Sequence, residues 1–395
     1  MFNFQMYTPT KVVFGKNAEA QVGNLVKEQN ANKVLIHYGS GSVVRSGLLD
    51  RVKTSLDAAG ISYVELGGVV PNPRLSLVYK GIELAKAKGV DFILAVGGGS
   101  AIDSAKAIAF GAAEDGDVWD LYEYTRTAKA CLPIGVVLTL AATGSEMSMG
   151  TVITKEEGLS KRAYNDDLAR PKFAIMNPEL TMTLPAYQTS CGCVDIMMHT
   201  MERYFTCGGN MEITDSIAEA LLRTVIINAK TLMEKPEDYD ARAEIMWAGS
   251  LAHNGLTGCG IRGGGDWSTH MLEHEMGGLY DVAHGAGLAA IWGSWARYVY
   301  RDCLPRFCRY AVNVMGVEPQ GSDEEVALRG IEATEAFFRS LNMPTSFADM
   351  GIRPTDEEMK EMARKCSVAT GGRQGSAKVL YEADMLAIYK MAAAI

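Results

Sequence analysis

The chain has 395 residues, 48% of them hydrophobic and 22% charged, and its formal net charge is −9. This length favours two domains, the composition is ordinary for a soluble globular protein, and the acidic balance argues against nucleic acid or an anionic membrane as the main partner. We expect neither a signal peptide nor a membrane span, because the first residues lack a basic stretch before an apolar run, and no apolar run reaches the ~18 residues of a transmembrane helix.

Short apolar strands alternate with helices through the first half of the chain. We expect strands at residues 33–38, 62–66, 92–96 and 134–138, and helices at 43–59, 75–88 and 101–110. Strands that alternate with helices of ten or more residues predict an α/β domain with a parallel sheet. This pattern places the first domain at residues 1–185.

Long helical segments replace this pattern from about Pro185 onward, with few strand-like runs among them. The domain at residues 186–395 is therefore predicted to be all-helical, with helices near 187–206, 211–233, 238–256, 267–277, 284–300, 324–340 and 355–368.

Three consecutive glycines follow the strand at 92–96 and precede a helix. Glycine lets the backbone turn sharply and approach a ligand, and the free N–H groups at a helix start attract phosphate. Gly97, Gly98, Gly99 and Ser100 therefore predict a phosphate-binding turn, with a turn that binds nothing as the alternative. The turn departs from the G-x-G-x-x-G fingerprint and does not identify the cofactor alone.

A second polar turn, Gly39-Ser40-Gly41-Ser42, follows the first expected strand. Nicotinamide-binding sheets often carry an acidic residue there, which binds the ribose 2′-hydroxyl. This turn has none, and Arg45 is nearby, so we expect NADP(H) rather than NAD(H), with use of NAD(H) left open. A third polar cluster, which includes Thr139 and Thr143, follows the strand at 134–138 and belongs to the same edge of the sheet.

The histidines suggest a metal site. Asp195 and His199 are spaced i, i+4 in an expected helix, His270 and His274 repeat that spacing, and His284 follows ten residues later. A carboxylate with imidazoles suits Fe²⁺ or Zn²⁺. The spacing leaves open which of His270 and His274 is a ligand.

A thiolate shell built on Cys191 and Cys193 is the alternative to the histidine site. These residues lie four and two positions before Asp195 and share its helix face poorly. The eight cysteines show no disulfide-framework spacing, which favours a reducing compartment, and we expect a cytoplasmic location.

These features together resemble the iron-containing (group III) alcohol dehydrogenases over essentially the whole chain. The run 266–287 is most similar to the branch of butanol dehydrogenases and NADPH-dependent aldehyde reductases. The matching motifs are Val70-Pro71-Asn72-Pro73, Gly97 to Lys106, Thr143-Gly144-Ser145-Glu146, Asp195-x-x-x-His199 and His270-x-x-x-His274 with His284. Two positions depart from the family pattern: Asn177, where Asp is usual, and Ser190, where a small apolar residue is usual.

The resemblance implies roles for individual residues. It implies one divalent metal, Fe²⁺ or Zn²⁺, held by Asp195, His199, His270 and His284, with His274 near the nicotinamide as a candidate for proton relay. The resemblance and the polar turns together give the expected cofactor contacts: Gly39, Ser40, Gly41, Ser42, Asn72, Gly98, Gly99, Ser100, Asp103, Thr139, Thr143, Lys161 and Leu180.

The expected function is interconversion of primary alcohols and aldehydes by hydride transfer to a metal-polarised carbonyl, with NADP(H), in a homodimer. The alternatives are a glycerol or diol dehydrogenase of the same superfamily, a dehydroquinate synthase-like lyase, and a non-enzymatic metal- or nucleotide-binding protein. The lyase would need several basic residues for a phosphorylated substrate, but the stretches 191–205 and 266–290 contain only Arg203 as a cation.

Overall fold

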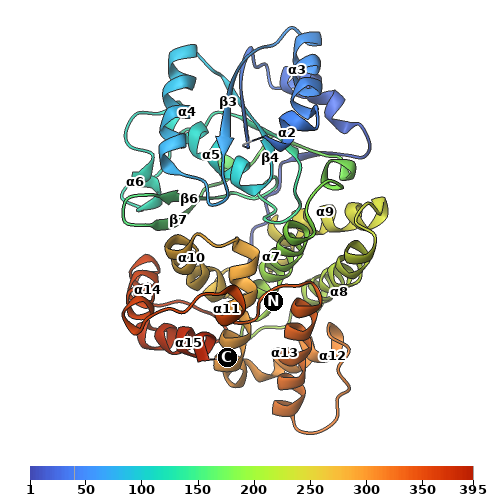
Figure 1. Ribbon diagram of the computed structural model, residues 1–395, viewed down its shortest axis with the longest axis vertical. Helices are drawn as coiled ribbons and strands as arrows, with labels where there is room; N and C mark the ends of the chain where they lie inside the picture. The colour runs from blue at the N-terminus through green and yellow to red at the C-terminus, as the bar shows by residue number, and fades with distance from the viewer. Residues whose placement is uncertain (40, 395) are drawn as a thin grey trace. The chain divides into compact units, whose positions relative to one another are not determined.

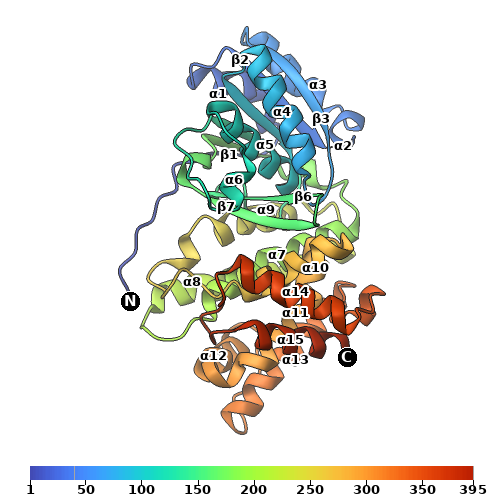
Figure 2. The ribbon, with the colours of Figure 1, turned by 90° about the vertical axis from the view of Figure 1, so that its left-hand side faces the viewer.

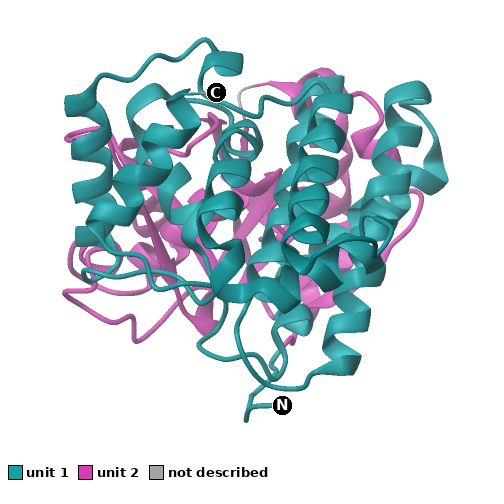
Figure 3. Cartoon of the chain, turned by 90° about the horizontal axis from the view of Figure 1, so that it is seen from below, with its two compact units in different colours: residues 1–7, 184–395 teal, residues 8–183 magenta. Residues whose placement is uncertain are grey.

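The computed structural model describes residues 1–39 and 41–394, which form two compact units (Figure 1, Figure 3). The α/β unit comprises Thr8–Thr183, and the helical unit comprises Met1–Tyr7 with Leu184–Ile395. Ser40, expected in the cofactor turn, lies outside the described residues. The expected division placed residues 1–7 in the first domain. In the structure they pack on the helical unit, where the backbone N–H of Phe2 donates to the carbonyl of Gly260 at 3.0 Å.

A six-stranded parallel sheet forms the centre of the α/β unit. Its strands are β1 (Lys11–Phe14), β2 (Lys33–Gly39), β3 (Ser62–Val69), β4 (Phe92–Gly97), β5 (Ile134–Leu138) and β8 (Phe173–Met176). Their order across the sheet is β1-β8-β5-β4-β2-β3, and the register pairs Val34 with Phe92 and Ile93 with Ile134. The predicted parallel sheet is confirmed. β1 and β8 were not predicted, because four residues are too few to show a periodic pattern.

Helices cover this sheet. Alternate side chains of β2 and β4, such as Val34, Ile36 and Leu94, form one buried core with α1 (Val22–Glu28) and α3 (Leu48–Ala58). The other helices of the unit include α4 (Leu75–Lys88), α5 (Gly99–Ala113) and the short α6 (Trp119–Tyr122). The predicted single helix at 43–59 was wrong: α2 (Ser42–Arg45) ends before Gly47, whose left-handed φ of 70° separates it from α3.

An antiparallel hairpin follows β5. It consists of β6 (Gly150–Lys155) and β7 (Ser160–Asn165), which are visible in Figure 2 and were not predicted. The buried amine of Lys106 on α5 fixes the segment before the hairpin, donating to the carbonyls of Ser145, Ser148 and Gly150 at 2.8, 2.9 and 2.7 Å. Burial lowers the pKa of Lys106 to about 8.

The helical unit confirms the predicted helical second half. Its main helices are α7 (Ala186–Tyr204), α8 (Glu212–Glu234), α9 (Tyr239–His253), α10 (Ser268–Tyr280), α11 (His284–Val299), α12 (Leu304–Asn313), α13 (Asp323–Ser340), α14 (Asp356–Ala369) and α15 (Glu382–Ala394). Across its described residues, 1–7 and 184–394, β pairing is limited to one bridge between Gln374 and Leu380. Among all described residues, we find no helix with the length and apolar character of a membrane span.

Candidate metal centre and cofactor turns

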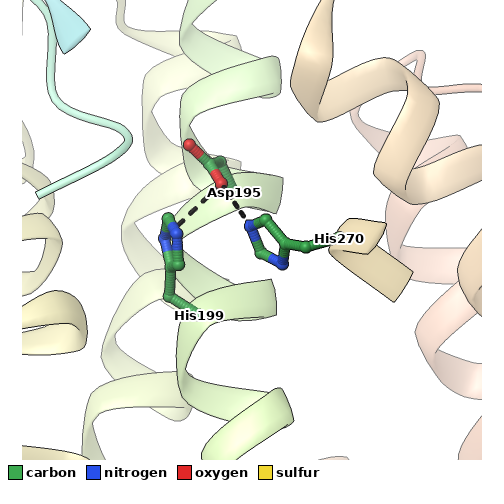
Figure 4. A group of neighbouring side chains, drawn as sticks. All are labelled: Asp195, His199 and His270. Carbon is green, nitrogen blue, oxygen red and sulfur yellow. Dashed lines mark ion pairs between the residues drawn. The ribbon is translucent and has the colours of Figure 1, made fainter. Parts of the chain in front are cut away.

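Three helices of the helical unit bring the predicted metal ligands together. Asp195 and His199 lie one turn apart on α7, His270 lies in the first turn of α10, and His284 is the first residue of α11 (Figure 4 shows the first three). The start of α11 lies against α7, since a Cβ on Gly285 would be 2.1 Å from the carbonyl oxygen of Cys191. Glycine at this position therefore allows the close approach that places His284.

The ring nitrogens surround one carboxylate oxygen. Oδ1 of Asp195 lies 3.4 Å from Nδ1 of His199, 3.6 Å from Nε2 of His270 and 3.7 Å from Nε2 of His284. These separations are too long for ordinary hydrogen bonds. Ligand atoms that surround a tetrahedral ion at about 2.0–2.2 Å lie roughly 3.3–3.6 Å from one another, so the observed spacing fits a metal.

The buried polar atoms at this point support the same conclusion. Asp195, His199 and His270 are 2–4% exposed. Within the described part of the chain, Asp195 Oδ1, His199 Nδ1 and His270 Nε2 have no hydrogen-bond partner. A buried polar atom without a partner costs free energy, and an ion bound between these three would satisfy all of them. The residues present therefore fit a divalent cation.

His274 occupies a neighbouring position on the same helix. It is 5% exposed, and its ring centroid lies 6.4 Å from that of His270 and 5.9 Å from that of His284. A ring nitrogen of His274 lies within 4.8 Å of possible ligand atoms of Glu273 and His284. A ring nitrogen of His270 lies within the same distance of ligand atoms of Asp195 and His199. The geometry thus places His270 in the central cluster and His274 beside it, a distinction that the spacing alone left open.

Two buried glutamates that the sequence analysis missed contact the histidines. Glu202 accepts hydrogen bonds from the backbone N–H and the Nδ1 of His270, and Glu273 lies 2.5 Å from Nδ1 of His284. Glu202 is seven residues after Asp195 on α7, so the helical periodicity that selected His199 could also have selected this residue. Glu273 has no such local signal, because its histidine belongs to the next helix.

The pKa values of His199 and His270 are shifted in opposite directions by burial and by the nearby carboxylates. Burial, followed by the neighbouring rings of His253 and His270, lowers the pKa of His199 well below its ordinary value. Burial also opposes charge on His270, but the carboxylates of Glu202 and Asp195 outweigh it and raise the pKa of His270 to about 9. In the metal-free chain His199 is therefore neutral near pH 7, with a lone pair for a cation.

The cysteine alternative gains no support from the described residues. The groups of described side chains that could hold a metal contain the histidines and carboxylates but neither Cys191 nor Cys193. Burial raises the pKa of Cys191 to about 11 and that of Cys193 to about 12, which keeps both as thiols rather than thiolates.

The expected cofactor turns lie at one edge of the sheet in the α/β unit. β2 and β4 are neighbours, but the chain leaves β2 toward β3 and leaves β4 toward β5, on opposite sides. Open α/β sheets bind ligands at the carboxyl ends of two such strands. The turn that follows Gly39 and the turn at Gly97 to Ser100 flank this point.

The glycine turn packs closely against the segment after β5. A Cβ on Gly98 would be 2.9 Å from Leu140, and a Cβ on Gly99 would be 2.5 Å from the side chain of Thr143. These glycines are therefore required by packing within the chain. The backbone N–H of Thr139 also donates to the carbonyl of Gly97 at 3.0 Å, so the predicted turns after β4 and β5 are held together.

Asp103 fixes the same region from α5. Its carboxylate accepts from the hydroxyl of Ser145 at 2.6 Å and from the backbone N–H of Val152 at 2.9 Å. These bonds join α5 to the polar segment and to the start of the hairpin. The structure thus gives Asp103 a structural task in addition to its expected place near the cofactor.

The remaining expected contacts lie along the same unit. Asn72 follows β3 in a left-handed conformation (φ 52°), and Lys161 is buried on β7, where it pairs with Thr154. Thr154 in turn donates its N–H to the carbonyl of Pro73, beside Asn72, at 2.8 Å. Leu180 packs, partly buried, against the core beneath α1 and α3.

Comparison with known proteins bears on both units. Residues 9–178 match the family model "Iron-containing alcohol dehydrogenase", and residues 189–393 match "Fe-containing alcohol dehydrogenase family, C-terminal". The chain belongs to the iron-containing alcohol dehydrogenase family. Membership confirms the resemblance drawn from the motifs, and it implies a nicotinamide cofactor and a divalent metal.

Individual members of the family are similar over nearly the full chain. The chain is 42% identical to the NADH-dependent butanol dehydrogenase A of Clostridium acetobutylicum, over 99% of each protein. It is 38% identical to the NADPH-dependent aldehyde reductase YqhD of Escherichia coli, over 89% of this chain and 90% of the reductase. The crystal structure of NADH-dependent butanol dehydrogenase A from Thermotoga maritima matches with a TM-score of 0.95 and 40% identity, over 100% of this chain and 99% of that one. The chain is therefore an alcohol or aldehyde oxidoreductase of this family.

Proposed function

We propose that this enzyme holds one divalent metal, iron or zinc, on Asp195, His199, His270 and His284 and interconverts primary alcohols and aldehydes, acting mainly as a reductase of short-chain aldehydes. The observation that carries the proposal is the convergence of Asp195 Oδ1, His199 Nδ1 and His270 Nε2, each without a hydrogen-bond partner in the described chain. The names of the similar butanol dehydrogenases and of the aldehyde reductase support the substrate class.

The two bound groups would supply different chemistry. A divalent metal with an open position supplies Lewis acidity toward a carbonyl or alcohol oxygen. A nicotinamide supplies or accepts hydride. The chain's own residues would hold the metal through one carboxylate and three neutral imidazoles. His274, beside this cluster, would exchange the proton of the alcohol, a role suited to imidazole near neutral pH.

We infer a preference for NADP(H) from the turn after β2. Gly39 and Gly41 expose backbone there, Ser42 adds a hydroxyl, and the described turn offers no carboxylate to repel a 2′-phosphate. Arg45 supports the inference, because its Nη1 lies 2.8 Å from where a Cβ of Gly41 would be. The guanidinium thus lies over the turn, where it would attract a phosphate. The related proteins divide between NADH and NADPH in their names, so this chain needs its own test.

The α/β unit and the helical unit would then be the cofactor-binding and metal-binding domains. A homodimer, suggested by the family resemblance, and a cytoplasmic location, suggested by the eight thiols, complete the proposal. A lyase with a phosphorylated substrate is disfavoured by the position of Arg203. Its Nη1 already donates to the carbonyls of His199 and Ala252, at 2.7 and 3.1 Å.

The test is a panel of aldehydes, alcohols and diols, assayed with NADPH and NADH on protein of measured metal content. We expect aldehyde-dependent oxidation of NADPH, and we expect His199→Ala to lose metal and activity together, since removing a ligand weakens metal affinity. A matched control for metal content is His37→Gln, which changes the buried histidine of β2. Full metal occupancy with near-normal turnover in His199→Ala would refute the assignment, and a strong preference for diols would favour the glycerol or diol dehydrogenase alternative.

A further inference from the structure

Two of the histidine rings are contacted on both of their nitrogens. His270 has Glu202 at Nδ1 and Asp195 at Nε2, and His284 has Glu273 at Nδ1 and Asp195 at Nε2. A neutral imidazole carries its proton on one nitrogen and a lone pair on the other. Asp195 Oδ1 lies 3.6 and 3.7 Å from the two Nε2 atoms, beyond ordinary hydrogen-bond distance, whereas each glutamate is within that distance of Nδ1. The proton of each neutral ring therefore belongs on Nδ1, and the lone pair on Nε2 faces Asp195 Oδ1.

Glu202 fixes more than the ring of His270. It is 1% exposed on α7, and its Oε1 accepts the backbone N–H of His270 at 3.0 Å while Oε2 accepts the ring Nδ1–H. Its own backbone carbonyl accepts the N–H of Asp266, just before α10, at 2.7 Å. Glu202 therefore ties the first turn of α10 to the helix that carries Asp195 and His199.

Glu273 contacts His284 at Nδ1, the ring nitrogen that does not face Asp195. It is fully buried on α10, one turn after His270, and its Oε2 lies 2.5 Å from Nδ1 of His284. Gly287 on α11 leaves room for this side chain, since a Cβ there would be 2.9 Å from Cγ and 3.1 Å from Oε1 of Glu273. A Cβ there would also be 2.6 Å from Cε of Met276, so the close packing of α11 on this part of α10 depends on the glycine.

We propose that Glu202 and Glu273 are positioning residues that hold His270 and His284 in the tautomer with the proton on Nδ1 and the lone pair on Nε2. This inference rests on the metal site proposed above. Carboxylates in this position orient ligating imidazoles and raise their basicity, and losing one lowers metal affinity about 10–100-fold. The two carboxylates also add negative charge beside the rings that would bind the cation.

A second metal on Glu273, His274 and His284 is the competing interpretation, because their ligand atoms also lie close together. The 2.5 Å separation of Glu273 Oε2 from His284 Nδ1 argues against it. Two ligand atoms on an ion with bonds of about 2.0–2.2 Å are roughly 2.8 Å apart or more, whereas a hydrogen bond brings them closer. The geometry therefore favours a hydrogen bond between Glu273 and His284.

The experiment compares Glu202→Gln and Glu273→Gln with the wild type. Zn²⁺ affinity is measured by competition with a chromogenic chelator, and the ring tautomers are read by NMR of ¹⁵N-histidine-labelled, Zn²⁺-loaded protein. We expect Zn²⁺ affinity to fall tenfold or more in Glu202→Gln, because one amide oxygen cannot serve both the ring and the backbone donor of His270. The Zn²⁺ affinity of Glu273→Gln should fall less, since the glutamine amide oxygen can still accept from Nδ1 of His284. In the wild type, both rings should carry the proton on Nδ1.

The matched control is Glu219→Gln on α8. Glu219 is equally a buried glutamate, and it accepts from the hydroxyl of Tyr204 at 2.8 Å and from Nε of Arg309 at 2.5 Å. We expect this variant to unfold more easily yet to bind Zn²⁺ as the wild type does. If Glu202→Gln does not fold, the inference is tested by the Zn²⁺ affinity of Glu273→Gln and by the ring tautomers of the wild type.

Wild-type Zn²⁺ affinity in both glutamine variants, equal loss in Glu219→Gln, or a proton on Nε2 of either ring would overturn the inference. The metal site itself is tested separately by His199→Ala. If that variant loses Zn²⁺ while both glutamine variants retain it, only the positioning roles are wrong. If His199→Ala binds Zn²⁺ as tightly as the wild type, the proposed site is wrong as well.

Discussion

Replacing Gly39 with aspartate should weaken the preference for NADP(H) that we infer. Gly39 is the last residue of β2, and the nearest heavy atom to a Cβ there is the carbonyl oxygen of Val69 at 3.7 Å, an ordinary contact. A Cβ therefore fits at this position without displacing the backbone. An aspartate would add a carboxylate to the turn, where it could accept from a ribose 2′-hydroxyl and would repel a 2′-phosphate.

The size of the effect follows from the exposure of this turn. Two unit charges about 4 Å apart interact by about 1 kcal/mol in bulk water and by about 4 kcal/mol at an effective dielectric of about 20. Ser42 and Arg45 are exposed, so solvent screens the turn and the lower part of that range applies. A loss of about 1–2 kcal/mol corresponds to roughly a 5–30-fold fall in the NADPH-to-NADH ratio of kcat/KM.

The assay is steady-state reduction of one short-chain aldehyde with each cofactor at fixed ionic strength. Gly39→Ala is the matched control, since it adds the same Cβ without charge and should leave the ratio near that of the wild type. Arg45→Gln should lower the ratio in the same direction, because it removes a cation beside the turn. The reasoning is refuted if the wild type uses NADH as efficiently as NADPH and Gly39→Asp leaves that ratio unchanged. An equal effect of Gly39→Ala would assign the change to shape rather than charge.

Three further predictions concern single residues. His274→Ala should keep its metal but lower turnover or alter its pH dependence, and loss of metal by elemental analysis would exchange the roles of His274 and His270. Burial lowers the pKa of His37 to about 4 from its ordinary 6.5, so its stabilising contribution is full above pH 6.5 and is lost as the pH falls toward 4. Relative to His37→Gln, the wild type should therefore lose about 1 kcal/mol of unfolding free energy between pH 7 and 5.5 in urea titrations, and parallel pH profiles would contradict this. Gly287→Ala should cost about 1–3 kcal/mol of stability through overpacking and should weaken Zn²⁺ binding by moving Glu273; unchanged binding would show that the side chain adapts.

The metal cluster was largely accessible from sequence because its main signal is local. A spacing of i, i+4 places Asp195 and His199 on one helix face, and the structure retains that face. Glu202 continues the same face but was overlooked, since a glutamate on a helix is ordinarily solvated. The contact between Glu273 and His284 could not be predicted, because it depends on how two helices pack.

The fold shows the same division between local and distant causes. The predicted strands are continuous apolar runs, whereas β1 and β8 are short and are defined by their neighbours in the sheet. α12 has Pro305 in its first turn, where proline is favourable, although the residue ordinarily indicates a break. The apolar residues of α15 are distributed around all sides of the helix, so its sequence shows no periodic apolar face.

The cofactor edge depends on strand order, which the sequence does not contain. The alternation of strands and helices predicts that Gly39 and Gly97 follow parallel strands, but not that these strands are neighbours. In the structure β4 returns to the side of β2 opposite β3, so the connections leave the pair in opposite directions. Only this crossover makes the turn that we propose selects between nicotinamide cofactors adjacent to the turn expected to bind phosphate. A carboxylate at position 39 should therefore change the NADPH-to-NADH ratio. A larger side chain at Gly98 or Gly99, which pack against Leu140 and Thr143, should instead weaken the binding of both cofactors.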